Sequence, residues 1–111
     1  MAYDMDLAAR VRALLQDRDG VSERAMFGGL AFLVGGHMGV AVGPDGGLML
    51  RVDPAATAAL LGEPHVSPTE MGGRELTGWV DVDTTALGSD AELRRWVTLG
   101  MDTAASMPPK P

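Results

Sequence analysis

The sequence predicts an α+β domain, a single antiparallel sheet with helices packed on it, in the order α-β-β-β-β-α-β-β-α. Apolar residues recur at helical spacing near both ends of the chain. Between them, short apolar runs alternate with glycine-rich turns, and an Asp-Pro pair separates an earlier group of runs from a later one. Because short turns join consecutive strands, we expect the strands to pair antiparallel.

The first predicted helix spans residues 4–17. Asp4 is a suitable N-cap, and Leu7 and Val11 follow at the spacing of one helical stripe. Gly20 ends the helical segment, because glycine tolerates the left-handed conformation that commonly follows a helix C-terminus.

Four strands are predicted next, over residues 21–27, 29–34, 38–42 and 48–52. A tight bend or bulge at Gly28-Gly29 and a turn at Gly35-Gly36 flank the second of them. Side chains alternate between the two faces of a strand, and both faces of this second strand are apolar. We therefore expect it to lie at the centre of the sheet.

The middle of the chain predicts a second helix over residues 53–62, with aspartate as N-cap and proline at the first helical position. Residues 63–73 contain two prolines, so we expect a loop over the surface. Two short strands are predicted after it, over residues 74–76 and 79–82.

A capping-box pattern, Ser89 with Glu92 three residues later, predicts the start of the last helix. Apolar residues continue behind it at helical spacing, and three prolines end the chain. We expect one folded domain over residues 1–106 and a flexible Pro-rich tail over residues 107–111.

The two long terminal helices are expected to cover one face of the sheet. The other face carries residues such as Ala31 and Met49, which leaves it partly apolar. An apolar face without a helix over it favours a binding partner.

The composition limits the classes of function. The chain has 111 residues, nine basic against fifteen acidic side chains, a net charge of −6 and no cysteine. This charge disfavours a free-standing nucleic-acid binder, and the missing cysteines exclude disulfides and cysteine metal sites. No segment has the pattern of a signal peptide or of a membrane span. We expect a cytoplasmic protein with no membrane partner.

No catalytic constellation is evident from the residues. A phosphate-binding loop needs a lysine, and the only lysine is Lys110. His37 and His65 lie in predicted turns or loops, and their spacing from the nearest acids predicts no metal site. We therefore expect no enzyme activity, no cofactor and no bound metal.

A few residues remain candidates for binding. Arg51 interrupts an otherwise apolar strand, so its guanidinium needs a carboxylate partner, which is the simpler interpretation, or an anionic ligand. Arg24 and Arg74 have similar settings and are candidates for neighbouring strands. Trp79 is interpreted as core or as a binding anchor, and His37 as a polar turn residue or as part of a ligand site.

One glycine-phenylalanine block is specific enough to suggest a family. Residues 24–33, Arg-Ala-Met-Phe-Gly-Gly-Leu-Ala-Phe-Leu, with Gly36-His37-Met38 after them, resemble the signature of the TfoX/Sxy N-terminal domain. Leu50-Arg51-Val52, residues 73–80 and residues 93–97 follow in the order of that family, and the closing Met-Pro-Pro-Lys is similar too. The structural motif comprises Met26, Phe27, Gly28, Gly29, Phe32 and Gly36.

The resemblance implies a compact α+β fold similar to type III secretion chaperones, in a stand-alone single-domain member. The family's namesakes are bacterial regulators of natural competence and transcription, thought to act with the cyclic-AMP receptor protein, and they carry a second, helical domain. The resemblance supplies no catalytic residues. It implies a protein partner, such as a transcription factor or a second copy of the chain.

Three hypotheses about function follow. The leading one is a non-enzymatic regulatory or adaptor domain that acts through protein–protein binding. The second is direct nucleic-acid binding through an arginine patch of Arg24, Arg51 and Arg74. The third is a small enzyme or ligand binder centred on His37 and Arg51, which requires both side chains in one pocket.

Overall fold

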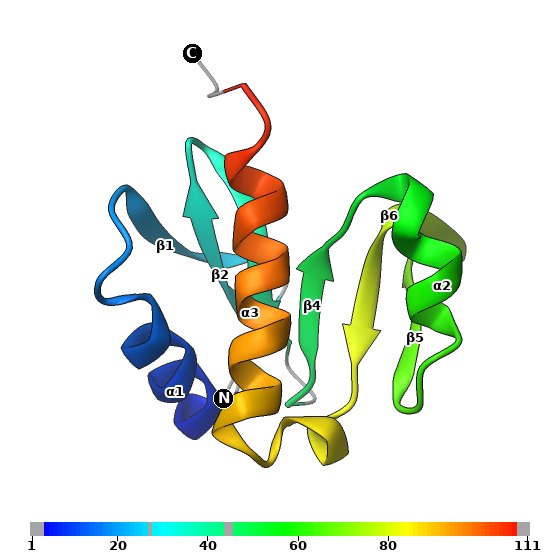
Figure 1. Ribbon diagram of the computed structural model, residues 1–111, viewed down its shortest axis with the longest axis horizontal. Helices are drawn as coiled ribbons and strands as arrows, with labels where there is room; N and C mark the ends of the chain where they lie inside the picture. The colour runs from blue at the N-terminus through cyan, green and yellow to red at the C-terminus, as the bar shows by residue number, and fades with distance from the viewer. Residues whose placement is uncertain (1–3, 27, 44–45, 109–111) are drawn as a thin grey trace.

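A computed structural model describes residues 4–26, 28–43 and 46–108. Within these residues, six strands form a single antiparallel sheet in the order β1-β2-β3-β4-β6-β5. Three α-helices lie on one side of this sheet, and α3 runs along the front of it (Figure 1). The predicted fold class and the predicted order of elements are confirmed.

The strands and helices have the following bounds. The strands are β1 Val21–Met26, β2 Gly29–Val34, β3 His37–Val42, β4 Leu48–Arg51, β5 Val66–Met71 and β6 Arg74–Val82. The α-helices are α1 Met5–Leu15, α2 Thr57–Leu61 and α3 Asp90–Ala105, and short 3₁₀ turns are η1 Pro54–Ala56 and η2 Thr84–Leu87.

The predicted helix caps form as expected. The backbone N–H of Leu7 donates to Asp4 Oδ1 at 3.0 Å, and that of Glu92 donates to Ser89 Oγ at 3.1 Å. Asp53 accepts from the Ala55 N–H at 2.9 Å and starts the η1–α2 segment. Each cap satisfies a backbone donor that would otherwise lack a partner at a helix N-terminus.

The glycine pairs shape the first two hairpins. Gly35 and Gly36 have φ values of 61° and 81° and connect β2 to β3 in a two-residue turn, which requires positive φ at both positions. Gly28, with φ 75°, lies in the turn between β1 and β2. Its neighbour Phe27, part of the predicted structural motif, lies outside the described residues. Gly29 is a site of close approach, since a Cβ there would lie 2.2 Å from the Val42 carbonyl oxygen.

The segment predicted as a loop over residues 63–73 contains the strand β5, so that prediction is wrong. β5 lies at the edge of the sheet, where the missing N–H of Pro68 costs no ladder hydrogen bond. The two short strands predicted after it are one strand, β6. Gly78 adopts φ 90° within β6 and allows the strand to continue through an irregular stretch.

The prediction that β2 is the central strand is also wrong. β3 and β4 occupy the middle, and only β1 separates β2 from the edge. Both faces of β2 are apolar because helices cover one of them while methionine side chains pack against the other. Burial of both faces therefore does not require a central position.

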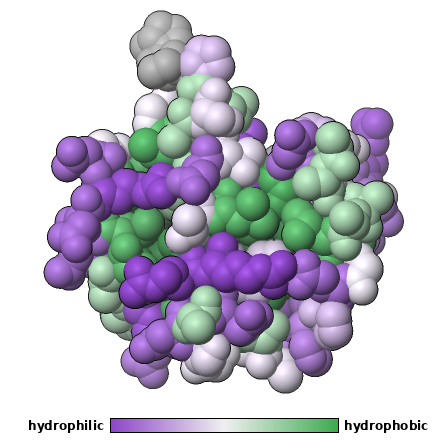
Figure 2. All heavy atoms as spheres, in the orientation of Figure 1, coloured by the Kyte–Doolittle hydropathy of each residue, from purple (hydrophilic) through white to green (hydrophobic). Residues whose placement is uncertain are grey.

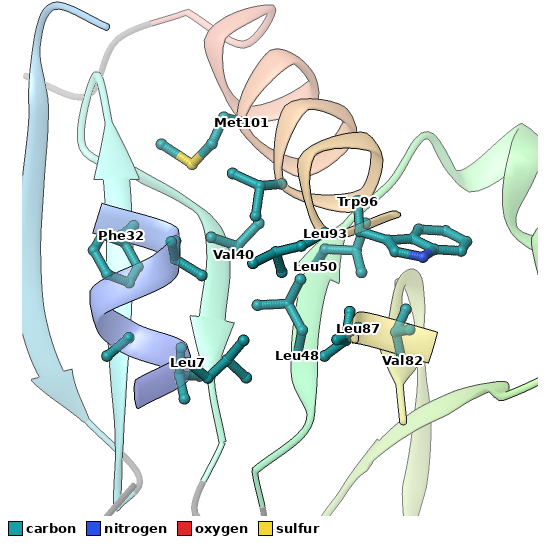
Figure 3. Packing of buried hydrophobic residues seen from close by; sticks show 14 of the residues in the cluster. Leu7, Phe32, Val40, Leu48, Leu50, Val82, Leu87, Leu93, Trp96 and Met101 are labelled. Carbon is teal, nitrogen blue, oxygen red and sulfur yellow. The ribbon is translucent and has the colours of Figure 1, made fainter. Parts of the chain in front are cut away.

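The main core lies between the sheet and the helices (Figure 3). Strand residues meet α3 side chains in this layer, and α1 closes its lower end. The members labelled in Figure 3 are Leu7, Phe32, Val40, Leu48, Leu50, Val82, Leu87, Leu93, Trp96 and Met101.

Two glycines let α3 rest directly on β3. Gly39 is the additional residue at the β-bulge where the β2–β3 register shifts. A Cβ on Gly100 of α3 would lie 2.6 Å from the Gly39 carbonyl oxygen and 2.6 Å from Val40 Cγ1. A Cβ on Gly39 would lie 2.6 Å from Met101 Sδ. A Cβ on Gly39 would also lie 2.9 Å from the Gly100 carbonyl oxygen. Real Cβ atoms do not approach backbone atoms this closely, so the close approach of helix and sheet needs both glycines.

Candidate functional site

The sheet face opposite the helices is called the open face from here on. Its floor consists of the buried side chains of Ala31, Leu33 and Ala41. Met26, Met38 and Met49 pack around this floor and remain partly exposed. The predicted partly apolar face without helices is thus confirmed, and the partly exposed members of its apolar cluster are methionines.

Cross-strand pairing defines one row of residues across the open face. Arg24 of β1 pairs with Ala31, Ala31 with Ala41, and Ala41 with Met49. Met49 pairs in turn with Asp81 of β6, which pairs with Ser67 of β5. The row runs from basic Arg24 on β1, over an apolar centre, to acidic Asp81 on β6 and polar Ser67 on β5.

A pocket of about 360 Å³ lies on this face. Its apolar wall includes Met26, Met38 and Met49, and its polar wall includes Thr69 and Asp81. The pocket therefore combines deformable thioether side chains with one localised polar wall.

Asp81 and Thr69 form the polar centre of the pocket. Thr69 is 3% exposed, and its Oγ1 donates a hydrogen bond to Asp81 Oδ1 at 2.7 Å. Burial raises the pKa of the Asp81 carboxyl, and the hydrogen bond from Thr69 opposes part of this rise. The ionised carboxylate is therefore poorly solvated in the free protein and would gain from a cationic partner.

Two further carboxylates line the same pocket, those of Glu70 and Asp83. Asp83 accepts hydrogen bonds from the backbone N–H and the hydroxyl of Thr85, which lower the pKa of its carboxyl. Among the described residues, no arginine, lysine or histidine lines the pocket. The pocket carries only negative formal charge.

Arg51 and Trp79 are brought together by the pairing of β4 with β6. The guanidinium carbon of Arg51 lies 4.4 Å from the Trp79 ring centroid, and Arg51 Nε donates to the Met38 carbonyl oxygen at 2.8 Å. Partial burial lowers the pKa of Arg51. The simpler prediction, a salt bridge to a neighbouring carboxylate, is wrong, because an aromatic face and a carbonyl oxygen take that role.

The second cavity, about 400 Å³ in volume, lies where β4 and β6 approach the C-terminal end of α3. Arg51, Trp79 and Met107 contribute to its lining. His37 does not, and its Nε2 instead lies 2.7 Å from the Pro108 carbonyl oxygen. The third hypothesis required His37 and Arg51 in one pocket, and the structure does not bring them together there.

The three arginines of the predicted patch are spread over the sheet. Arg24 is exposed on the edge strand β1, three strands away from Arg51 on β4. Arg74 is exposed at the start of β6, whereas the residue of β6 that pairs with Arg51 is Trp79. The expectation of a patch on neighbouring strands is therefore wrong for Arg24, because β2 and β3 intervene.

The part of the chain that the structure describes has neither a metal-binding cluster nor a membrane-spanning helix. There, no three histidine, aspartate or glutamate side chains gather as ligands for a metal ion. No helix in the same residues combines the length and the apolar character that crossing a membrane requires. The predicted tail is described only up to Pro108, so its flexibility stays a prediction.

Several residues of the open face were missed by sequence reasoning, chiefly Thr69, Asp81 and Met38. The signal for Asp81 was present, since it alternates with the apolar Val80 and Val82 along one strand. Its place opposite Met49 depends on the register of β4 against β6. That register is not readable from either strand alone.

The fold and the pocket define an α+β protein whose sheet is covered by helices on one face and open on the other. The family model of the TfoX N-terminal domain matches residues 13–104. The chain therefore belongs to the TfoX N-terminal domain family, as the glycine-phenylalanine block predicted. This membership points to a regulatory or competence-related domain. Comparison with curated proteins finds no match, and comparison with solved structures finds none either, so the likeness to type III secretion chaperones stays a prediction.

Proposed function

We propose that this chain is a non-enzymatic regulatory or adaptor domain that acts by binding another protein through its open face. The observation that supports the proposal is the cluster of Met26, Met38 and Met49 around the floor of that face. Partly exposed methionines beside a pocket suit protein recognition, because their unbranched thioether side chains adapt to different partner shapes.

The helix-bearing face offers a different kind of surface. Viewed from that side, one hydrophilic band runs below an apolar area between α3 and α2, and a second band lies at the left of the view (Figure 2). Ion pairs involve the helices: Arg95 of α3 binds Glu63, which follows α2, through two hydrogen bonds of 2.9 and 2.6 Å, and Arg10 of α1 lies 3.3 Å from Asp90 of α3. Side chains already engaged in this way favour the open face as the docking surface.

Family membership supports a role in regulation, and a partner that takes part in transcription fits that role. The spread of Arg24, Arg51 and Arg74 weakens the nucleic-acid alternative. The separation of His37 from the cavity of Arg51 weakens the ligand-binding alternative in the form that required both.

The test is affinity capture from the native cell with matched variants as bait. We expect the double variant Met26→Gln/Met49→Gln to capture its partner about tenfold less than the wild type, because glutamine keeps the length of methionine but removes its apolar contact. Met5→Gln is the control, since Met5 is 66% exposed and lies on α1, away from the open face.

Circular dichroism must show that the variants remain folded. A partner that the double variant retains at the yield of the wild type would exclude the open face. Capture of no protein at all, together with a monomer in light scattering, would remove the proposal.

A further inference from the structure

We infer that the open face binds a basic amphipathic helix of a partner protein, with the apolar side of the helix on the methionines and a cationic side chain at Asp81. This inference rests on the proposed function and names the chemistry of the partner. It follows from the charge of the pocket, from the dimensions of the apolar strip formed by Ala31, Ala41 and Met49, and from the environment of Asp81.

Charge complementarity selects a basic partner. Glu70, Asp81 and Asp83 all line the pocket, and among the described residues no cationic side chain lines it. The whole chain carries a net charge of −6. A basic segment is therefore attracted at long range and at the pocket side of the face, where an acidic segment of the same shape is repelled, whereas Arg24 beside Ala31 leaves the β1 side basic.

The apolar strip has the width of one helix. Ala31, Ala41 and Met49 lie on three consecutive strands, so the strip spans about 10 Å between strand axes. An α-helix with its side chains is about 10–12 Å wide. The strands β2 and β3 each contain six residues, a length of about 20 Å that a helix of about 13 residues matches.

Asp81 supplies a specific contact at the edge of the strip. It pairs with Met49 across the strands, so a helix that rests on Met49 places a flanking lysine or arginine beside this carboxylate. The hydrogen bond from the buried Thr69 hydroxyl fixes the position of Asp81 Oδ1 before binding. An ion pair formed at this site removes water from a carboxylate that is already partly desolvated.

The experiment uses the whole protein labelled with ¹³C at its methionine methyl groups and two matched peptides of about 14 residues. One peptide is an amphipathic helix of leucine and lysine, and the other replaces each lysine by glutamate. We expect the lysine peptide to shift the methyl signals of Met26, Met38 and Met49 and to leave those of Met5 and Met101 in place. The glutamate peptide is expected to bind at least about tenfold more weakly.

Variants of two acidic residues distinguish a specific contact at Asp81 from general electrostatic attraction by the net charge of the protein. Asp81→Asn is expected to weaken the lysine peptide about threefold to fivefold, the effect of one partly screened ion pair. Asp19→Asn removes the same charge from an exposed turn between α1 and β1 and is expected to leave the affinity unchanged.

The outcomes distinguish the inference from the proposed function. Equal affinity for both peptides, or equal effects of Asp81→Asn and Asp19→Asn, would overturn the basic character of the partner and keep the open face as a docking surface. Methyl shifts at Met26, Met38 and Met49 that follow protein concentration without peptide would show a second copy there and overturn the inference. No shift with either peptide would overturn it too, and the proposed function would then depend on the capture experiment alone.

Discussion

Asp81 is a partly buried carboxylate whose environment disfavours its ionised form. Its carboxyl accepts a hydrogen bond from Thr69, yet burial among the residues of the open face raises its pKa. A carboxyl with a raised pKa is less stable in its ionised form in the folded protein than in the unfolded chain. Residues of this kind are typical of functional sites, where the compensating group arrives with the ligand.

We expect Asp81→Asn to raise the melting temperature at pH 7. The folded wild type binds its proton more tightly than the unfolded chain, so its stability falls as pH rises from the unfolded pKa of about 3.9 to the folded pKa. Asparagine does not ionise, so the variant does not lose stability as the pH rises, and its side-chain oxygen still accepts the hydrogen bond from Thr69. The difference should shrink below about pH 4, as thermal unfolding followed by circular dichroism across pH will show.

Asp83→Asn is the control, because we expect it to change the melting temperature in the opposite direction. Hydrogen bonds from Thr85 lower the pKa of the Asp83 carboxyl, so its ionised form stabilises the folded state at neutral pH. We expect this variant to lower the melting temperature at pH 7. A lower melting temperature for Asp81→Asn at the same pH would contradict the assignment of Asp81 as a destabilising carboxylate.

At the scale of elements, the crossing of α3 over β3 determines how closely helix and sheet pack. Gly39 and Gly100 meet where the bulge of β3 turns its backbone toward the helix. In the sequence, Gly100 follows Trp96 and Val97 at helical spacing, but the need for glycine at that position follows only from the bulge beneath it.

Gly100→Ala is expected to destabilise the fold by about 1–3 kcal/mol, because its Cβ would overlap the Gly39 carbonyl oxygen and force the helix away from the sheet. Gly88→Ala is the matched control. Gly88 has φ −68° and no atom within 4 Å of an added Cβ. Chemical denaturation measures both, and equal stabilities of the two variants would contradict the close crossing.

At the scale of the whole molecule, the two faces of the sheet differ in how deeply their side chains are buried. The face under the helices carries the main core and accounts for most of the buried apolar surface (Figure 3). The open face carries a smaller cluster around Ala31, Leu33 and Ala41, with partly exposed methionines. Adjacent residues of one strand therefore contribute to different properties.

Leu50 and Met49 test this division within β4. Leu50 is fully buried in the main core, so Leu50→Ala is expected to cost about 2–5 kcal/mol of folding free energy. Met49→Ala removes a side chain that is partly exposed, and we expect a cost of about 1 kcal/mol together with loss of partner capture. Equal losses of stability in denaturant titrations would contradict the assignment of the open face to binding.

Much of this architecture was readable along the chain. Helix caps at Asp4, Asp53 and Ser89 depend on a few consecutive residues, and the turn at Gly35-Gly36 depends on two positive φ values. Alternation along a strand also separated Ala31 from Phe32. These features are local, so the order of residues is sufficient to predict them.

The chain by itself determined the α+β class, the order of elements, the family and the partly apolar character of one sheet face. Only the tertiary structure decided that β5 is an edge strand, that Arg51 stacks on Trp79 and that Asp81 faces the methionines. The physical reason is that these features depend on the pairing and register of strands far apart in sequence. Several registers preserve the same alternation of apolar residues, and packing of the whole domain selects among them.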